Sequence, residues 1–530
     1  MGRAVKKPKK LPDGGAPLVI GLADPGMTPL LRAGLGGLAA SARAILLEGE
    51  PSATWPQPVA VGAGSVAVEP NQITIDWGGK TPERTLRPLF LRSFRISDRV
   101  ITLPGMFEPS RPAAFGLPIR SRLQAAMTRT FLQHGRMRTR SGNPIVRTFT
   151  IDDEVLSFSI EPYSWYAHQD GFEVVEAALR SGGEELAGWA YPGAVQRHVA
   201  FGQTRVSYSP SEALCACFAL VGCVAFEVRG GGALVVPEPT DLVQFGRSRS
   251  FLTPDRLEQT VAGGTGDAVL SVQLALRMDS IRGRAGVGAT HGVLFRSTPW
   301  ASQQRSRVAV LTTGIVQGDV LDRYEAAVSA LPARVVQAHV DDDEATGSFV
   351  APSELRAFIA DNLASGRRWF AGFATCRTAE RHPRLLHHYR QSDNLGALLP
   401  NEREGLIRML EHLDEAERAL VRSVHAALRQ RFGAIAADAH NAVSMRNRFS
   451  GERDRWRIAF AGAKTLEQIR AALADLWSRA GSNQELRKNW EAILPLLRPR
   501  NWQAARDLAL VALASYQGTH GEEAEKGESE

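Results

Sequence analysis

Apolar residues recur along the first part of the chain in alternating strand and helix patterns. Residues 18–20 form a short apolar run that predicts a buried strand, and apolar side chains at helical spacing follow in residues 30–45. Alternating patterns predict one hairpin in residues 59–77, turning at 69–72, and another in residues 146–159. Because these helices and strands do not repeat as regular βαβ units, this part of the chain is predicted to be α+β.

The first predicted helix contains glycines that require an explanation. Thr28 and Pro29 predict its start, as an N-cap followed by a first-turn proline. Three glycines lie inside the helical pattern, and each costs about 1 kcal/mol relative to alanine; they are Gly34, Gly36 and Gly37. Close packing of the helix against a sheet is the favoured explanation. A phosphate-cradling loop is the alternative, although no Gly-Lys-Ser/Thr sequence follows.

Weaker patterns fill the rest of this part. Residues 89–103 are predicted to be extended, and residues 118–135 to form a helix that leads into a basic loop at 136–144. Ser211 is predicted to cap a following apolar helix. The sequence Arg-Gly-Gly-Gly at 229–232 predicts the turn between two strands after that helix.

Strand patterns nearly vanish after residue 353. Helical patterns cover residues 402–432, 466–479, 484–497 and 502–516, which predicts a bundle of about four helices. The predicted division of the chain is a disordered basic tail (1–16), a mixed α+β body (17–340), a linker (341–352), an all-α helical bundle (353–517) and a disordered acidic tail (518–530).

Composition limits the class of protein. The 530 residues exceed what one compact core organises, and the formal net charge of +7 suits a polyanionic partner. No membrane-spanning helix is expected, because every long apolar run is interrupted. Cys215, Cys217 and Cys223 lie in an apolar run without zinc-ligand spacing, so buried thiols in a reducing cytoplasm are expected.

No catalytic motif emerges, so neither an enzyme activity, nor a metal, nor a cofactor is predicted. The chain lacks a Gly-x-Ser-x-Gly elbow, a His-Glu-x-x-His motif and a P-loop. The acidic run at 341–344 is best explained as a solvated linker. His382, His387 and His388 leave a metal-dependent nuclease as an alternative, although no carboxylates accompany them. A regulatory scaffold that binds no nucleic acid is the second alternative.

Arginine clusters point instead to nucleic acid. Arginine binds phosphate through paired hydrogen bonds and stacks on bases, while Asn and Gln read base edges. The predicted nucleic-acid-binding residues are Arg136, Arg138, Arg140, Asn143, Arg247, Arg249, Gln303, Gln304, Arg305, Arg307, Arg367, Arg368, Arg446, Arg448 and Arg453. Aromatic neighbours predicted to stack on bases are Phe251, Trp300, Trp369, Phe370, Phe449 and Trp456. The bundle carries 26 lysines and arginines against 18 acidic residues, which suits backbone contact with single strands.

Several segments also resemble a known family. The run PGMTPLLRAGLGGLAA at 25–40 resembles the N-terminal signature of the large subunit of type I CRISPR Cascade complexes, in the Myxan subtype. Further similar segments follow in family order: FLQHG at 131–135 with YSWYAHQ at 163–169, ALVVPEPTDL at 233–242 and PWASQQRSR at 299–307.

The resemblance implies a non-catalytic subunit of a cytoplasmic antiviral ribonucleoprotein. Its C-terminal bundle would be similar to the Cascade small subunit. The subunit would bind the handle end of the CRISPR RNA, recognise the protospacer-adjacent motif in double-stranded target DNA, and stabilise the R-loop with its displaced strand. Its implied partners are the backbone, handle-capping and small subunits, and a recruited helicase-nuclease or transposition protein.

Overall fold

The computed structural model describes residues 15–108, 116–133, 135–151, 154–181, 184–185, 207–280, 286–296, 309–314, 316–338, 347–374 and 400–517. The chain divides into two compact units. The N-terminal unit comprises Met1–Gln317 and Ala333–Pro352, and the C-terminal unit comprises Gly318–Pro332 and Ser353–Glu530. The predicted fold class is confirmed, because the first unit mixes helices with strands and the helices after residue 400 stand without strands among the described residues.

Helix α1 (Pro29–Gly49) lies at the centre of the N-terminal unit. Its predicted start is confirmed, since the Thr28 side chain accepts a hydrogen bond from the Leu31 amide at 3.4 Å. The glycines let α1 approach helix α6 (Pro210–Gly222) backbone to backbone, because a Cβ on Gly34 would lie 1.8 Å from the Cys215 oxygen. Gly36 faces the Phe245 ring of α7 (Leu242–Ser248). Close packing is therefore the correct explanation; the partners are mainly helices, and Gly36 also lies against Pro239 of strand β14 (Gly231–Pro239), which belongs to a sheet.

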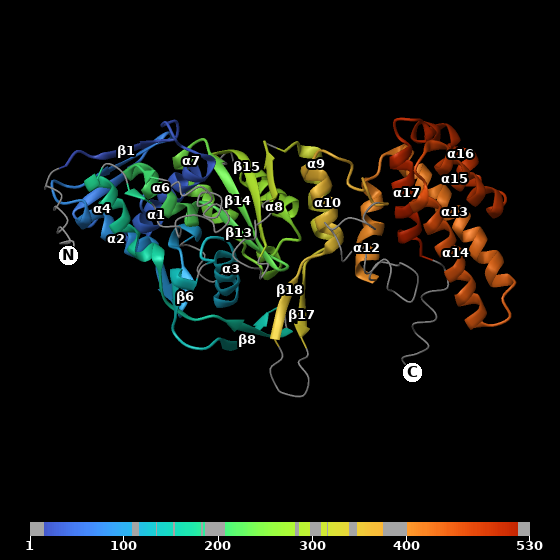
Figure 1. Ribbon diagram of the computed structural model, residues 1–530, viewed down its shortest axis with the longest axis horizontal. Helices are drawn as coiled ribbons and strands as arrows, with labels where there is room; N and C mark the ends of the chain where they lie inside the picture. The colour runs from blue at the N-terminus through green and yellow to red at the C-terminus, as the bar shows by residue number, and fades with distance from the viewer. Residues whose placement is uncertain are drawn as a thin grey trace, which may run out of the picture. The chain divides into compact units, whose positions relative to one another are not determined.

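Burial also explains the apolar composition of α1. Among the described residues, α1 alone is long and apolar enough to cross a membrane, yet 72% of its most apolar window is buried inside the protein. The same helix contacts α6 on one side and α7 on another (Figure 1). These contacts identify α1 as a core helix.

Two four-stranded antiparallel sheets lie in this unit. The first has the order β1-β4-β3-β2 and contains β1 (Leu18–Gly21), β2 (Val59–Val61), β3 (Gly64–Val68) and β4 (Gln72–Asp76). The hairpin predicted at 59–77 is confirmed, whereas β1 is a partly exposed edge strand. The second sheet is a meander of β13 (Val224–Val228), β14 (Gly231–Pro239), β15 (Val287–Arg296) and β16 (Ala309–Thr313). Helices α3 (Leu117–Thr130) and α8 (Thr265–Ser280) pack on it (Figure 1).

The predictions for residues 89–103 and for the cap of α6 are wrong. Residues 89–103 are not continuously extended: α2 (Glu83–Ser93) precedes the short strands β5 (Arg95–Ser97) and β6 (Val100–Thr102). Ser209, and not Ser211, caps α6, because its hydroxyl accepts from the Glu212 amide while the Glu212 carboxylate accepts from the Ser209 amide. Pro210 then occupies the first helical position.

Two hairpins lie side by side elsewhere in the unit. β8 (Ile145–Ile151) pairs with β9 (Glu154–Ile160), which confirms the hairpin predicted at 146–159. β17 (Arg334–Ala338) pairs with β18 (Gly347–Ala351), and the Ser157 amide of β9 donates to the Ser348 hydroxyl at 3.1 Å. Residues 347–351 were predicted to be linker, so the strand pairing corrects that part of the prediction.

The remaining elements of the N-terminal unit are short. They are η1 (Pro104–Met106), η3 (Gly135–Met137), β7 (Arg138–Arg140), β10 (Tyr163–Tyr166), η4 (Ala167–Asp170), α4 (Gly171–Ser181), β11 (Glu184–Glu185), β12 (Ser207–Tyr208), η7 (Arg249–Leu252) and η8 (Leu257–Thr260). β7 pairs with β10, so the basic stretch at 136–144 is partly strand and not a free loop.

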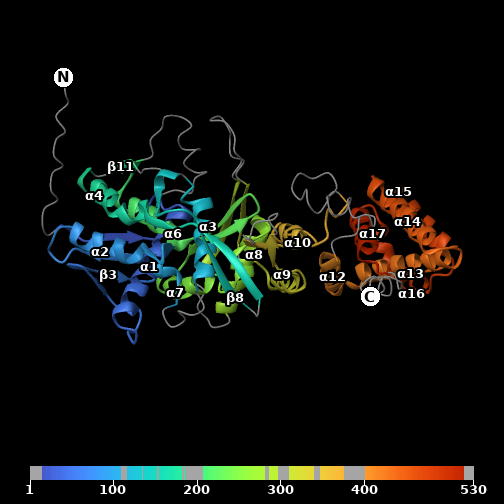
Figure 2. The ribbon, with the colours of Figure 1, turned by 90° about the horizontal axis from the view of Figure 1, so that it is seen from below.

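The C-terminal unit is built around helix α17 (Trp502–Ser515), which is buried along most of its length. It contacts α12 (Pro400–Met409), α13 (Glu415–Ala437), α14 (Ala442–Gly462) and α15 (Leu466–Ala480) (Figure 2). The other elements of the unit are α9 (Gly318–Ala330), α10 (Glu354–Ala364), η10 (Leu410–His412), α16 (Gln484–Ile493) and η11 (Leu494–Leu497). The single helix predicted at 402–432 is two helices, because Asp414 caps α13 through a reciprocal pair with Glu417.

Candidate nucleic-acid interface

Arg247 lines an open cleft in the N-terminal unit. The cleft has a volume of about 290 Å³ and lies between α1, the segment around Trp55, Glu108 and the α7–η7 junction. Arg247 donates through Nη2 to the Trp55 carbonyl at 2.5 Å, and no carboxylate pairs with it among the described residues. Phe251 is 40% exposed at the same cleft. The structure therefore brings together a predicted arginine and its predicted aromatic neighbour.

Arg249 was predicted to bind nucleic acid, and its burial contradicts this prediction. Its side chain is fully buried and donates to the carbonyls of Val221 at 2.5 Å and Cys223 at 2.8 Å. A third bond reaches the Thr253 hydroxyl at 2.9 Å. Burial lowers the pKa of Arg249 to about 10, so the guanidinium stays charged at neutral pH. Arg249 joins the end of α6 to η7 and is unavailable to a ligand.

In the basic stretch at 136–144, which follows helix α3, the described arginines already have partners within the protein. Arg138 donates to the Tyr163 hydroxyl at 3.0 Å and to the Leu132 carbonyl, so it links β7 to β10 and to the segment after α3. Arg140 is exposed but pairs with Glu161 at 2.8 Å. Asn143 is exposed in the connection from β7 to β8. Of the predicted interface residues in this stretch whose side chains the structure describes, Arg140 and Asn143 are exposed.

Several predicted site residues lie outside the described part of the chain. They are the side chain of Arg136 and residues Gln303, Gln304, Arg305 and Arg307. The same holds for Trp300, for the acidic run at 341–344, for His382, His387 and His388, and for most of the two predicted tails.

Arg367 and Arg368 differ in their surroundings. Arg367 is exposed, whereas Arg368 pairs at 3.3 Å with the buried carboxylate of Glu417, whose pKa is raised by burial. Trp369 and Phe370 are 2% and 1% exposed. The prediction that these two rings stack on bases is wrong, because they belong to the core of the C-terminal unit.

Helix α14 places its predicted arginines in three different environments. Arg446 is exposed, and Arg448 pairs with Asp438 at 2.9 Å. Arg453 is half-buried, with its guanidinium carbon 5.6 Å from the centre of the Phe432 ring, and burial lowers its pKa. The predicted stacking residues of this cluster also turn inward, since Trp456 is 1% exposed and Phe449 packs on Phe432.

Sequence reasoning missed an exposed surface on α16. Trp490 is 41% exposed and meets the buried Trp477 edge to face, with ring centres 6.3 Å apart. Arg487, Trp490 and Leu494 follow at helical spacing and form what we call the Trp490 face; Lys488 lies beside it and Glu491 lies on it. No described carboxylate pairs with Arg487 or Lys488. The signal was the short run Arg-Lys-Asn-Trp at 487–490.

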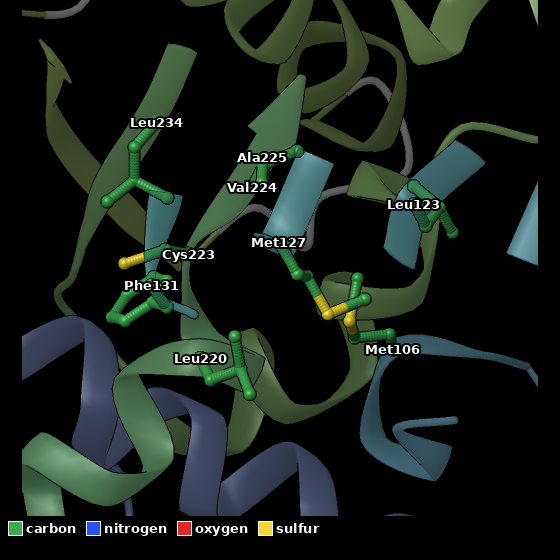
Figure 3. A pocket seen from close by; sticks show the side chains of 9 residues that line it. All are labelled: Met106, Leu123, Met127, Phe131, Leu220, Cys223, Val224, Ala225 and Leu234. Atoms are coloured by element: carbon green, nitrogen blue, oxygen red, sulfur yellow. The ribbon is translucent and has the colours of Figure 1, made fainter. Parts of the chain in front are cut away.

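Among the described residues, no three His, Cys, Asp or Glu side chains are placed to hold a metal ion. Figure 3 shows a small hollow in the N-terminal core, lined by apolar side chains and Cys223. Burial raises the pKa of Cys223 to about 12, so its thiol is protonated and unreactive. As predicted, Cys215 and Cys217 are also buried and free.

Comparison with known proteins establishes what kind of protein carries these surfaces. Residues 19–217 match the DevT N-terminal domain, and residues 409–530 match the DevT C-terminal domain. The CRISPR-associated protein Cas8a1/Csx13 of Myxococcus xanthus (strain DK1622) is 50% identical over 535 residues, which cover 99% of this chain and 92% of that protein. The class is thus a type I CRISPR-associated protein. The chain belongs to the Cas8a1/Csx13 family of Cascade large subunits, in agreement with the resemblance found in the sequence.

Proposed function

We propose that this large subunit acts without catalysis as a nucleic-acid-binding part of its complex. It binds the handle end of the CRISPR RNA and the target DNA, recognises the protospacer-adjacent motif, and stabilises the R-loop. The opened DNA then recruits the effector, a helicase-nuclease or a transposition protein. Guide pairing supplies most of the sequence specificity, as in RNA-guided recognition generally. A cytoplasmic location follows from this role.

The Trp490 face is the observation that carries the proposal. Exposed tryptophan beside cationic side chains suits an unpaired strand, because a base stacks on the ring while the cations hold the phosphates. Trp490 is 41% exposed, whereas the neighbouring Trp477 is 8% exposed. Arg487 and Lys488 lie within one turn of it, and α16 fixes their spacing. Family membership supports this assignment, because a Cascade complex contains CRISPR RNA as a polyanionic component.

The test measures binding of the purified full-length chain to a fluorescent single-stranded 20-mer at several salt concentrations. Log K should fall linearly with log salt, with a slope of about −0.7 for each phosphate contacted. Trp490→Ala should weaken binding by about 1–3 kcal/mol at every salt concentration. Replacing Arg487 and Lys488 by Gln should flatten the slope by roughly 1.4. Phe349→Ala is the matched control, because Phe349 is also an exposed aromatic residue, at 45%.

A salt-independent affinity would contradict the proposal. So would equal affinities of the wild type and the Trp490→Ala chain, because the Trp490 face would then be an ordinary solvated surface. If the wild-type chain binds no 20-mer at any salt concentration, the regulatory scaffold without nucleic-acid binding becomes the better explanation.

A further inference from the structure

We propose that the cleft beside Arg247 binds a single nucleotide, with its base on Phe251 and its phosphate on Arg247. The inference rests on the proposed function, which it deepens by naming a nucleotide-sized site in the N-terminal unit. The ligand chemistry is a nucleoside monophosphate unit, which is either free or one residue of a strand.

Charge in the cleft favours an anion. Arg43 and Glu108 neutralise one another through two hydrogen bonds, of 3.1 and 3.3 Å. Arg247 therefore supplies the unbalanced charge of the cleft. A guanidinium has five N–H donors, and Arg247 uses one of them for the Trp55 carbonyl. The remaining donors form the planar fork that matches the oxygens of a phosphate.

The aromatic side of the cleft is held in place. Phe251 lies in η7 between Ser250 and Leu252, which are 5% and 4% exposed and anchor the backbone on both sides. The buried Trp55 indole donates to the Val243 carbonyl at 3.0 Å, so this wall is fixed as well. A ring that stays 40% exposed on such a rigid turn is available for stacking by a planar base.

Glu108 adds a polar group that a base can use. One of its oxygens accepts from the Ser250 hydroxyl at 3.3 Å as well as from Arg43. A carboxylate has about four acceptor positions, so Glu108 keeps capacity for an amino group on the edge of a base. Stacking, phosphate binding and an edge contact together describe a nucleotide better than an acidic peptide, which would use neither Phe251 nor Glu108.

The volume of the cleft matches one nucleotide. The cleft holds about 290 Å³, at the lower end of the range of roughly 300–1,000 Å³ that small-molecule sites occupy. That space suits one base with its sugar and phosphate, and any further nucleotides of a strand would lie outside the cleft. In a strand, the bound nucleotide would have to leave the stack of its neighbours.

The experiment titrates the full-length chain with AMP, CMP, GMP and UMP by calorimetry, and with a single-stranded RNA 10-mer by fluorescence anisotropy. Phe251→Ala should weaken binding of the mononucleotides about 5- to 100-fold, and Phe251→Tyr should restore it. Arg247→Gln should weaken the nucleotides but not the corresponding nucleosides. Phe349→Ala and Arg256→Gln are matched controls, since both residues are exposed and lie outside the cleft.

The outcomes distinguish a free nucleotide from a nucleotide within a strand, and they distinguish failure of the cleft proposal from failure of the proposed function. Loss of both mononucleotide and RNA binding in Phe251→Ala assigns the site to a nucleotide within a strand. Loss of mononucleotide binding alone assigns it to a free nucleotide. If the wild type binds the 10-mer and Phe251→Ala binds it equally well, without any mononucleotide binding, the cleft proposal fails and the proposed function stands. If the wild type binds neither ligand, both fail.

Discussion

Single residues of the N-terminal unit show how burial decides the role of a side chain. Arg247 and Arg249 are two positions apart, yet one lines an open cleft and the other is fully buried. The turn from α7 into η7 makes this difference, and no periodicity in the sequence reveals it. Thr28 and Pro29 were predictable because capping depends on local geometry alone. Arg249 was not, because its partners Val221 and Cys223 lie 28 and 26 residues away.

Gly37→Ala should destabilise the chain. A Cβ at this position would lie 2.3 Å from the Phe218 oxygen and 2.6 Å from the Gly222 nitrogen, so α1 and α6 would have to separate. Overpacking of this kind costs about 1–3 kcal/mol. Gly49→Ala is the control in the same helix, because nothing lies within 4 Å of its Cβ position. Urea unfolding followed by circular dichroism should show a lower midpoint for Gly37→Ala only; equal midpoints would mean that α1 and α6 do not pack this closely.

Arg249→Leu should destabilise the N-terminal unit more strongly. It leaves the buried carbonyls of Val221 and Cys223 without donors, at about 1–3 kcal/mol each. Arg249→Lys should not restore stability, because an ammonium lacks the planar fork that reaches three acceptors. The exposed Arg256→Leu should change stability by less than about 0.5 kcal/mol. An unfolding midpoint for Arg249→Leu equal to that of Arg256→Leu would refute the structural role.

Helices and strands were predictable where the spacing of their own apolar residues is regular. The hairpins at 59–77 and 146–159 and helices α15 and α17 agree with the alternation or the helical spacing of their residues. Strands β5 and β6 have three residues each, which is too short for an alternating pattern that would distinguish them from α2. Helix α14 was missed because few of its residues are buried and it is stabilised by contacts with α13, α15 and α17. The turn that follows Trp369 and Phe370 is held by a residue distant in the sequence, because the Gly372 amide donates to the Asp507 carboxylate of α17 at 2.7 Å.

Packing of α13 on α17 should make the C-terminal unit sensitive to acid. His425 of α13 bonds through Nε2 to the Ala512 carbonyl at 2.9 Å, and burial lowers its pKa from 6.5 to about 4. Because the pKa is lower in the folded state, the stability from neutral His425 is complete above about pH 6.5 and is lost as the pH falls toward 4. The unfolding free energy lost when His425 becomes fully protonated is about 3 kcal/mol.

His425→Gln isolates this effect, because the burial-raised pKa of Asp507 acts in the opposite direction and is common to both chains. The unfolding free energy of the wild type should fall relative to that of His425→Gln between pH 6.5 and 4. A difference between the two chains that does not change over this interval would show that His425 titrates normally.

At the scale of the whole molecule, the family and the order of the mixed and helical parts were predictable from the sequence, but the limits of the helical part were not. Gly405 of α12 lies against Leu331, which is 2% exposed and follows α9. The Arg356 side chain of α10 donates to the Leu331 carbonyl at 3.2 Å. Helix α9 thus belongs with helices that follow it by many residues, and a break in composition near residue 341 could not show this.

Three fragments test the limits of the helical part. The fragment 318–517 should be more stable than 353–517, which uncovers the contacts of α9 and Leu331. A fragment that starts at Met409 should be the least stable, because it also discards the fully buried Leu406. Each buried leucine lost costs roughly 1.5–3 kcal/mol. Thermal unfolding by circular dichroism should give this order. Equal midpoints for the first two fragments would assign α9 to the body and support a boundary near 353.

The central claim is that this subunit binds target DNA and keeps it open. The most direct measurement is R-loop formation by the RNA-guided complex purified with and without this chain, on motif-bearing and motif-free duplexes carrying a fluorescent base that reports unpairing. We expect rapid opening of the motif-bearing duplex only when the chain is present, slower opening with the Trp490→Ala chain, and recovery when wild-type chain is added back. Equal opening of both duplexes by the complex without this chain would contradict the account.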